Sequence, residues 1–239
     1  MKTKEPLPQG EDKKKLVQAM FDDIAPTYEK TNRIISFGLD QKLRKTALKE
    51  LRAAQGSTVL DFASGTGDFT RMLKSNDINP ISCDLSFGML SNGREIDNPI
   101  QCDGTKLPLG DNSVDGVVCG YSLRNFVNLQ DTFNEIFRVL KPGARFVAVD
   151  ITVPKNKAVK FVNQLWFAKT APKLGWLISK NKGAYEYLPR STSYLPDNEE
   201  ISKQLENAGA ENIAISPLVL GSLILICATK PKTISDDKS

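Results

Sequence analysis

The chain has 239 residues, of which 40% are hydrophobic and 25% charged, as expected for a globular protein with a substantial core. Its formal net charge of +4 is too small to indicate a nucleic-acid partner, and its four cysteines include no C-x-x-C pair, so neither a metal site nor a disulfide framework is predicted. Histidine is absent, which excludes the commonest general base and every nucleophile that is activated by histidine.

Residues 1–55 are predicted to form a helical cap. Apolar residues recur at helical spacing from Leu16 to Phe21 until Pro26 ends the pattern, and a second helix is predicted over residues 39–53. The polar start of the chain lacks the apolar stretch of a signal peptide, and no segment reaches the ~20 apolar residues needed to span a bilayer. We therefore expect a cytoplasmic protein that is soluble or peripheral to the inner face of the cell membrane.

Residues 56–151 alternate between short apolar strands and amphipathic helices. This alternation is typical of parallel βαβ units, so the sequence predicts an α/β fold with a doubly wound, mostly parallel sheet. Residues 196–230 add a helix at 197–208 and two closing strands, which a short turn around Gly221 should pair antiparallel. We expect these two ranges to form the core of a single domain and the tail at 231–239 to be disordered.

Residues 152–195 interrupt the alternation with a predicted helical insertion, a lid within the same domain. From residue 151 to residue 185 there is no Asp or Glu, and lysines are interleaved with aromatic residues. They are Lys155, Lys157, Lys160, Lys169, Lys173, Lys180 and Lys182, with Phe161, Trp166, Phe167 and Trp176. Such a segment is typical of a surface that contacts an anionic membrane. It is equally typical of a lid that packs its aromatic residues over a pocket, and the two alternatives are compatible.

The segment "VLDFASGTGD" carries the strongest local signal. A buried strand ends at Asp61, and the chain turns through Gly65 and Gly67 into a helix, where open α/β sheets bind nucleotide-like ligands. A dinucleotide would need a third glycine where this chain has Thr70, and Asp68 would repel its phosphates. S-adenosylmethionine has no phosphate and carries a sulfonium and an ammonium group, so nearby carboxylates favour it instead.

Acidic residues also end the next two predicted strands. Asp84 lies where a carboxylate can accept hydrogen bonds from both ribose hydroxyls, and Asp103 with Gly104 can reach the adenine edge. Together with Asp61 they predict a site for S-adenosylmethionine along one edge of the sheet. The alternative is that these aspartates cap the helices or loops that follow them.

Four longer segments carry more specific motifs. They are "FDDIAPTYEKTNRIISFGLDQKLRK", "VLDFASGTGD", "YSLRNFVNLQDTFNEIFRVLKPGARF" and "YEYLPRSTSYLPDNEEISKQLENAGAENI". From about Phe21 to Thr229 the chain resembles the ubiquinone/menaquinone biosynthesis C-methyltransferases. The resemblance implies a class I, Rossmann-like fold with a seven-stranded sheet whose last strand is antiparallel. It also implies S-adenosylmethionine bound at Thr66, Asp84, Asp103 and Gly104. Many relatives have a serine where this chain has Gly120, so only a backbone contact with the cofactor is expected there.

The reaction that the resemblance implies is methyl transfer to a ring carbon of a membrane-embedded quinol, demethylmenaquinol or a ubiquinone precursor. Such a transfer mainly requires methyl group and nucleophile to be held in line in a dry pocket, an effect that can reach ~7–11 kcal/mol and needs no histidine. The ring carbon becomes nucleophilic when a quinol hydroxyl, whose pKa is near ~10, ionises.

Four residues are candidates for the acceptor side of this reaction. Arg124 and Asn125 follow a predicted buried strand, where Arg124 could lower the pKa of the quinol hydroxyl and stabilise its anion. Asn125 could hold the second oxygen, and Tyr28 and Tyr121 could contact the ring.

Several alternatives remain open at the level of the sequence. Arg124 could form a structural ion pair with Asp131 or Asp103, and Asn125 could cap the helix that follows. The chain could methylate another small aromatic or isoprenoid acceptor, act as an NAD-dependent oxidoreductase, or bind the cofactor without turnover. The sequence does not decide between a monomer and a homodimer.

Overall fold

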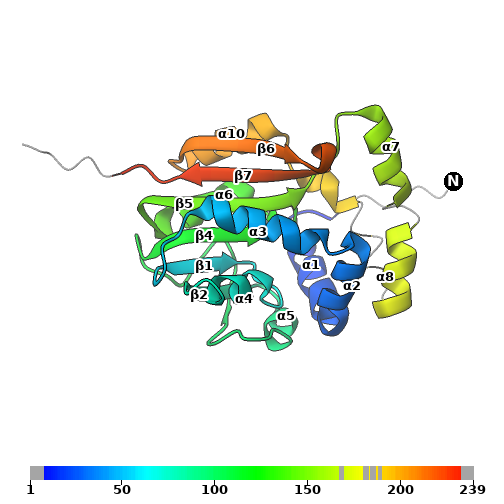
Figure 1. Cartoon of the computed structure of the whole chain (residues 1–239), viewed down its shortest axis with the longest axis horizontal. Helices are drawn as coiled ribbons and strands as arrows, with labels where there is room; N and C mark the ends of the chain where they lie inside the picture. The colour runs from blue at the N-terminus through cyan, green and yellow to red at the C-terminus, as the bar shows by residue number, and fades with distance from the viewer. Residues whose placement is uncertain (1–7, 167–169, 180–182, 184–186, 188–189, 233–239) are drawn as a thin grey trace, which may run out of the picture.

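Seven strands form one sheet in the computed structural model, which describes residues 8–166, 170–179, 183, 187 and 190–232. They are β1 (Thr58–Phe62), β2 (Asn79–Asp84), β3 (Ile100–Gln101), β4 (Val114–Gly120), β5 (Leu140–Ile151), β6 (Glu211–Leu218) and β7 (Leu223–Thr229). The order is β3-β2-β1-β4-β5-β7-β6, and β7 runs antiparallel to both of its neighbours (Figure 1). This confirms the predicted seven-stranded sheet with its antiparallel last strand.

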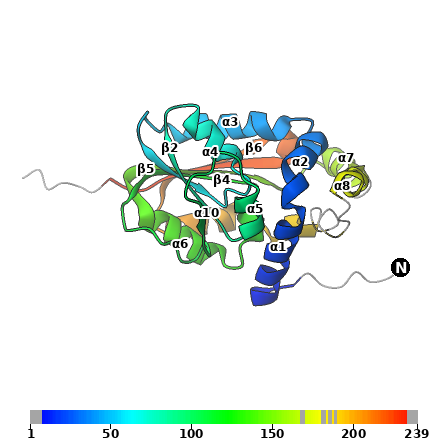
Figure 2. The ribbon, with the colours of Figure 1, turned by 90° about the horizontal axis from the view of Figure 1, so that it is seen from below.

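Helices cover both faces of the sheet (Figure 2). One face carries α3 (Leu39–Leu51) and α4 (Asp68–Lys74), and the other carries α6 (Leu129–Val139) and α10 (Asn198–Asn207). Successive side chains of a strand point to opposite faces, so Leu60 and Phe62 of β1 pack with α6 whereas Val59 packs with α3. Burial on both faces explains the continuous apolar runs of these strands.

The N-terminal helices lie beyond the carboxyl ends of the parallel strands (Figure 1). They are α1 (Gly10–Ile24), η1 (Ala25–Thr27) and α2 (Tyr28–Ser36), and α1 packs against the short α5 (Phe87–Ser91). The carboxylate of Asp22 accepts hydrogen bonds from Ser86 Oγ at 2.5 Å and from the N–H of Gly88 at 2.8 Å. The ammonium of Lys13 donates to the Phe126 carbonyl at 2.6 Å, and burial lowers its pKa to about 8. These contacts fix α1 over the end of the sheet.

The insertion contains α7 (Lys157–Leu165), α8 (Ala171–Ser179) and η4 (Thr192–Tyr194). Helix α8 packs against α2, so the insertion extends the cap at the same end of the molecule (Figure 1). None of the helices in the described ranges is long and apolar enough to cross a membrane. Part of what the sequence predicts lies outside the described residues, namely Phe167, Lys169, Lys180, Lys182 and most of the tail, 233–239.

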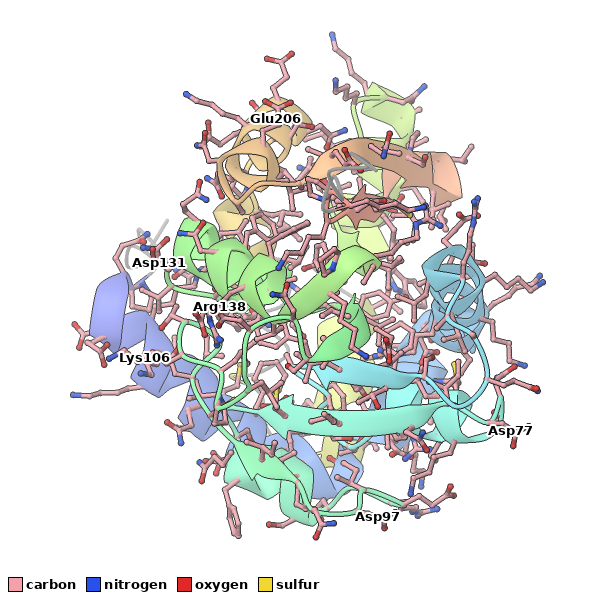
Figure 3. All side chains as sticks on the ribbon, turned by 90° about the vertical axis from the view of Figure 1, so that its left-hand side faces the viewer. Asp77, Asp97, Lys106, Asp131, Arg138 and Glu206 are labelled. Carbon is pink, nitrogen blue, oxygen red and sulfur yellow. The ribbon has the colours of Figure 1, made fainter. Side chains whose placement is uncertain are left out.

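The opposite end of the molecule is covered by charged side chains of both signs (Figure 3). Arg138 is an example, since its guanidinium binds Glu135 at 2.8 Å and Asp111 at 2.7 Å. Helix α6 ends at Val139 and β5 begins at the next residue, so "KPG", residues 141–143, lies inside the strand. An irregular register between β4 and β5 absorbs the extra residues.

Candidate active site

A cavity lies at the carboxyl ends of β1, β2 and β4 and is closed on one side by α1. We call it the cofactor cavity. It is lined by five of the residues predicted to bind S-adenosylmethionine, Gly65, Thr66, Asp84, Gly104 and Gly120. A Cβ atom on Gly104 would lie 2.6 Å from Phe62 Cζ, whose ring is stacked on that of Phe126 at 5.1 Å. The wall at Gly104 therefore has no room for a side chain.

Asp84 connects the glycine turn to the end of β2. Its Oδ2 accepts a hydrogen bond from the N–H of Gly65 at 2.8 Å, and its Oδ1 accepts one from the N–H of Ser86 at 2.9 Å. Burial raises the pKa of Asp84, and these backbone donors oppose that rise. Because each carboxylate oxygen can accept more than one bond, Asp84 can also accept from a ribose diol in the cavity.

Three other predicted cofactor residues, Asp61, Gly67 and Asp103, do not line this cavity. Asp61 Oδ2 accepts from the N–H and Oγ1 of Thr70 at 2.8 and 2.7 Å, which caps α4, and burial raises the pKa of Asp61 to about 6. Gly67 has φ 87° where α4 begins. Asp103 forms an ion pair with Lys14 at 2.5 Å. These contacts favour the alternative that Asp61 and Asp103 stabilise the fold. Roles of Asp61, Gly67 and Asp103 in cofactor binding remain predictions.

A second and larger cavity opens between the N-terminal helices and the insertion. Its volume is about 1320 Å³, compared with about 800 Å³ for the cofactor cavity, and both volumes include space open to solvent. Most of its lining is apolar and includes Met20, Ile24, Ile35, Phe37, Leu43 and Trp166. Three predicted acceptor-side residues, Tyr28, Tyr121 and Arg124, also line it, and we call it the acceptor cavity. Asn125 lines the cofactor cavity instead.

Arg124, in η2 (Leu123–Asn125), is buried and fully engaged in an ion pair with Asp150. Its Nη1 also donates to the Tyr121 carbonyl at 2.6 Å and its Nε donates to Ser191 Oγ at 3.1 Å. The carboxylate of Asp150 also accepts the backbone N–H of Arg124 at 3.1 Å. An ion pair is therefore present, but the partners predicted for it, Asp131 and Asp103, are wrong.

Asn125 is held by the acceptor side of the fold, since its Oδ1 accepts a hydrogen bond from Tyr187 Oη at 3.2 Å. The prediction that Asn125 could cap the next helix is wrong, because Asn128 caps α6 by accepting the N–H of Asp131 at 3.1 Å. Tyr28 stands edge-on to Phe21, with ring centroids 6.0 Å apart, and burial raises its pKa. Tyr28 therefore stays protonated at neutral pH.

Comparison with known proteins decides the family. The chain matches the family model described as "ubiE/COQ5 methyltransferase family" from residue 9 to residue 230. It belongs to this family. A demethylmenaquinone methyltransferase of Corynebacterium urealyticum is 35% identical over 90% of this chain and 94% of its own length. One from Bacteroides fragilis is 32% identical over 91% of this chain and 94% of its own.

Solved structures support the same fold at low sequence identity. Phosphoethanolamine N-methyltransferase 2 of Haemonchus contortus, determined with phosphomonomethylethanolamine and S-adenosylhomocysteine, has a TM-score of 0.67 at 16% identity. The match covers 90% of this chain and 60% of that one. A methyltransferase of Thermotoga maritima, described as a possible histamine N-methyltransferase, has a TM-score of 0.63 at 17% identity, with 89% and 99% of the two chains covered.

This ubiE/COQ5 family member is an S-adenosylmethionine-dependent methyltransferase, and the residues of its cofactor cavity fit that cofactor. Asp84 can accept from the ribose, and the third glycine of a dinucleotide-binding turn is replaced by Thr70, which binds Asp61. When bound, S-adenosylmethionine supplies the methyl group.

Two residues at the boundary of the cavities were not predicted from the sequence. Among the described residues, Phe21, Tyr28 and Arg44 line both cavities, and only Tyr28 was a candidate. Phe21 and Arg44 lie on α1 and α3 at ordinary helical positions, so nothing in the local pattern singled them out. The structure also explains Gly120, because a Cβ atom there would lie 2.1 Å from Arg44 Nη1. The missing side chain makes room for a guanidinium.

Proposed function

We propose that this enzyme transfers the methyl group of S-adenosylmethionine to a ring carbon of demethylmenaquinol, giving menaquinol and S-adenosylhomocysteine. The observation that carries the proposal is the wall of Phe21, Tyr28 and Arg44 at which an apolar, aromatic-lined cavity meets the cofactor cavity. A flat naphthoquinol ring suits such a cavity. The relatives called demethylmenaquinone methyltransferase support the same acceptor.

The chemistry requires a ring carbon with raised electron density. Ionisation of a quinol hydroxyl supplies it, the electron pair of the ring carbon displaces S-adenosylhomocysteine from the methyl group, and the proton on that carbon then leaves to water. No residue has to be a strong base for the displacement itself. Apolar walls favour the reaction because they exclude water and strengthen every charge interaction inside the cavity.

Tyr28, Tyr121, Arg124 and Asn125 are assigned to the acceptor side in this proposal. Tyr121 has a φ of 65°, a left-handed conformation that is uncommon for a bulky residue and must be held by its surroundings. The bond from Arg124 to the Tyr121 carbonyl and the pairing of Arg124 with Asp150 provide that support. Arg124 therefore positions the loop that carries Tyr121 and Asn125.

A methyl-transfer assay tests the proposed reaction. The purified enzyme is given labelled S-adenosylmethionine and either a short-chain demethylmenaquinol or the corresponding benzoquinol precursor of ubiquinone. We expect the naphthoquinol to gain a methyl group on its ring and the benzoquinol to react more slowly. Absence of methyl transfer to the naphthoquinol, in enzyme that still binds S-adenosylhomocysteine, would refute the proposed acceptor.

We also propose that the mouth of the acceptor cavity lies on an anionic membrane, from which the tail of the substrate enters. Exposed apolar side chains are carried by the segments at this end of the molecule, and we call them the apolar ridge: Phe37, Phe161, Val162, Leu165, Trp176, Leu177 and Leu220. Phe37 lines the cavity and its ring lies 5.3 Å from that of Trp166 at the end of α7. The segments that carry the ridge lie at one end of the molecule (Figure 1).

Two residues of the ridge, Phe37 and Leu220, have an uncommon backbone conformation. Phe37 and Leu220 are each 81% exposed, and both have a left-handed backbone, with φ of 53° and 56°. Such a conformation costs a bulky residue ~1–2 kcal/mol, and exposure to water provides no compensation. Exposed lysines stand beside the ridge, namely Lys155, Lys157, Lys160 and Lys173. Apolar and cationic groups together suit the surface of an anionic bilayer.

Vesicle sedimentation tests the membrane proposal. We expect the enzyme to pellet with vesicles that contain phosphatidylglycerol and to be released as the salt concentration rises, because screening weakens the attraction of the lysines. Binding that is indifferent to lipid charge would contradict the electrostatic part.

A further inference from the structure

Arg44 lies at the boundary between the two cavities. It projects from α3, is 7% exposed, and lines both the cofactor cavity and the acceptor cavity. Phe21 and Tyr28 are the other described residues at this boundary, and neither carries a charge at neutral pH. Among the described residues that line both cavities, Arg44 is therefore the one that carries a permanent charge.

The guanidinium of Arg44 is incompletely satisfied. Its Nε is buried and has no hydrogen-bond partner in the part of the chain that the structure describes. The nearest carboxylate oxygen is Asp68 Oδ2, 3.7 Å from Nε, which is an ion pair but too long for a hydrogen bond. Asp68 is itself bound more closely by Arg71 at 2.7 Å and by Arg33 at 3.2 Å. Arg71 and Arg33 also pair with Glu29, at 2.8 and 3.9 Å, so three guanidinium groups share two carboxylates.

Aromatic rings hold Arg44 in place without neutralising it. Its Cζ lies 5.0 Å from the ring centroid of Phe69 and 5.0 Å from that of Tyr121. Burial opposes the charge, but Asp68 and the hydroxyls of Tyr121 and Tyr28 outweigh it and raise the pKa of Arg44. The groups that influence Arg44 or respond to its charge are Asp68 of α4, Asp61 of β1, Tyr28 of α2, Cys119 of β4 and Tyr121. The guanidinium stays charged throughout the working pH range.

Gly120 shows that the fold reserves space for this cation. A Cβ atom at position 120 would lie 2.1 Å from Arg44 Nη1 and 2.8 Å from Phe69 Cε2. Gly120 has an ordinary backbone conformation, so a turn does not require glycine here. Glycine is required at position 120 because the Arg44 guanidinium and the Phe69 ring approach the backbone there.

We propose that Arg44 is the catalytic cation of this methyltransferase, and that it binds the ionised hydroxyl of the quinol during methyl transfer. The inference rests on the proposed function, because it takes a quinol as the acceptor. S-adenosylmethionine places a positive sulfonium in the cofactor cavity. A second buried cation beside it is unfavourable unless an anion lies between them, and a phenolate oxygen is that anion. In the proposed step its electrons raise the density of the ring carbon, which takes the methyl group while the S–C electron pair stays on sulfur.

The pH dependence of turnover gives a direct test. Arg44→Met should lower kcat at pH 7 by about tenfold to 100-fold, because the loss of one or two pKa units of stabilisation reduces the phenolate fraction by that factor. The deficit should shrink as the pH approaches ~10, where the quinol ionises without help. Arg44→Lys should recover part of the rate. Arg33→Met is the matched control, since it also removes a cation from Asp68 but lies outside both cavities, and its pH profile should match that of the wild type.

A second variant covers the case in which Arg44→Met does not fold. Gly120→Ala keeps the charge of Arg44 but displaces its Nη1, and should show the same pH-dependent deficit. A deficit that is equal at every pH in the soluble variants, or a normal kcat in Arg44→Met, would overturn the assignment.

A binding measurement separates this inference from the proposed function. The apparent pKa of 1-naphthol is followed by its absorbance in the presence of enzyme and S-adenosylhomocysteine. We expect the wild type to lower that pKa by at least about one unit and Arg44→Met not to do so. If the wild type shows this shift but does not methylate demethylmenaquinol, the acceptor is wrong and the role of Arg44 stands. If the wild type and Arg44→Met leave the same naphthol pKa, the role of Arg44 is wrong.

Discussion

The two cavities of this protein are built in different ways. The cofactor cavity is formed mainly by the loops that follow β1, β2, β3 and β4, which are adjacent strands of the sheet. The acceptor cavity is formed mainly by α1, α2, α3 and α7, together with the loop of Tyr121 and Arg124 after β4 and the start of β7; these segments are spread over the chain from Met20 to Leu223. Cofactor binding is thus a property of the sheet, whereas acceptor binding is a property of the helices docked on its end. A substitution should therefore be able to weaken cofactor binding without weakening acceptor binding, and the reverse.

Asp84→Asn should have the largest effect on ligand binding and should act on the cofactor side. The variant loses the charge that accepts from Gly65 and that a ribose diol needs. Hydrogen bonds to a charged group contribute about 1.5–3 kcal/mol each, so affinity for S-adenosylhomocysteine should fall by about 100-fold in calorimetry. Asp103→Asn is the matched control, because Asp103 lies outside the cavity and is paired with Lys14. Equal losses in the two variants would mean that both aspartates hold the cofactor.

The bond between Asp61 and Thr70 at the start of α4 can be tested through the pH dependence of the free energy of unfolding. Burial raises the pKa of Asp61 to about 6 in the folded protein, whereas an aspartate in an unfolded chain has a pKa near ~3.9. Between these two pH values Asp61 is protonated in the folded protein but ionised in the unfolded chain. The contribution of Asp61 to the free energy of unfolding is therefore gained as the pH falls from about 6 to 4 and lost as the pH rises. The gain should approach about 3 kcal/mol relative to Asp61→Asn in urea unfolding. A stability difference that does not change with pH would show that Asp61 is ionised in the fold at all these pH values.

Arg124→Lys should separate the acceptor side from the cofactor side. Lysine cannot bind Asp150, Ser191 and the Tyr121 carbonyl at once, so Tyr121, which lines only the acceptor cavity, should lose its position. We expect affinity for S-adenosylhomocysteine to stay within about twofold and kcat to fall by roughly tenfold, a loss of about 1.4 kcal/mol of transition-state stabilisation. Near-normal turnover would exclude Arg124 from the acceptor side.

Phe37→Ser should have the smallest effect. It should weaken membrane binding and leave cofactor binding and methyl transfer in solution unchanged. Phe37 is exposed in solution, so its removal should leave the free energy of unfolding nearly unchanged. The apolar area that it would insert corresponds to about 1 kcal/mol, or roughly fivefold in vesicle affinity. Phe87→Ser is the matched control, because Phe87 is also exposed but lies on α5, away from the ridge. The same loss in both variants would show that the ridge is not a specific contact surface.

The comparison of the cavities also explains what the sequence could predict. The mostly parallel sheet with its antiparallel last strand and the glycine turn with Asp84 were predictable, because strand ends carry local patterns and parallel strands end at one edge. The ion pair of Arg124 was assigned to the wrong partners because Asp150 lies on the neighbouring strand, β5, and only the strand pairing brings the two together. Arg44 was missed because its role depends on how α3 docks against the sheet.

The close approach of Arg44 to position 120 also has a consequence for how this protein can evolve. With 2.1 Å between Arg44 Nη1 and a Cβ atom at Gly120, no side chain can appear at position 120 while the arginine keeps its place. A lineage that gains a side chain there must move the guanidinium of Arg44 or replace the arginine. Changes at the two positions are therefore expected to be coupled among descendants of this sequence.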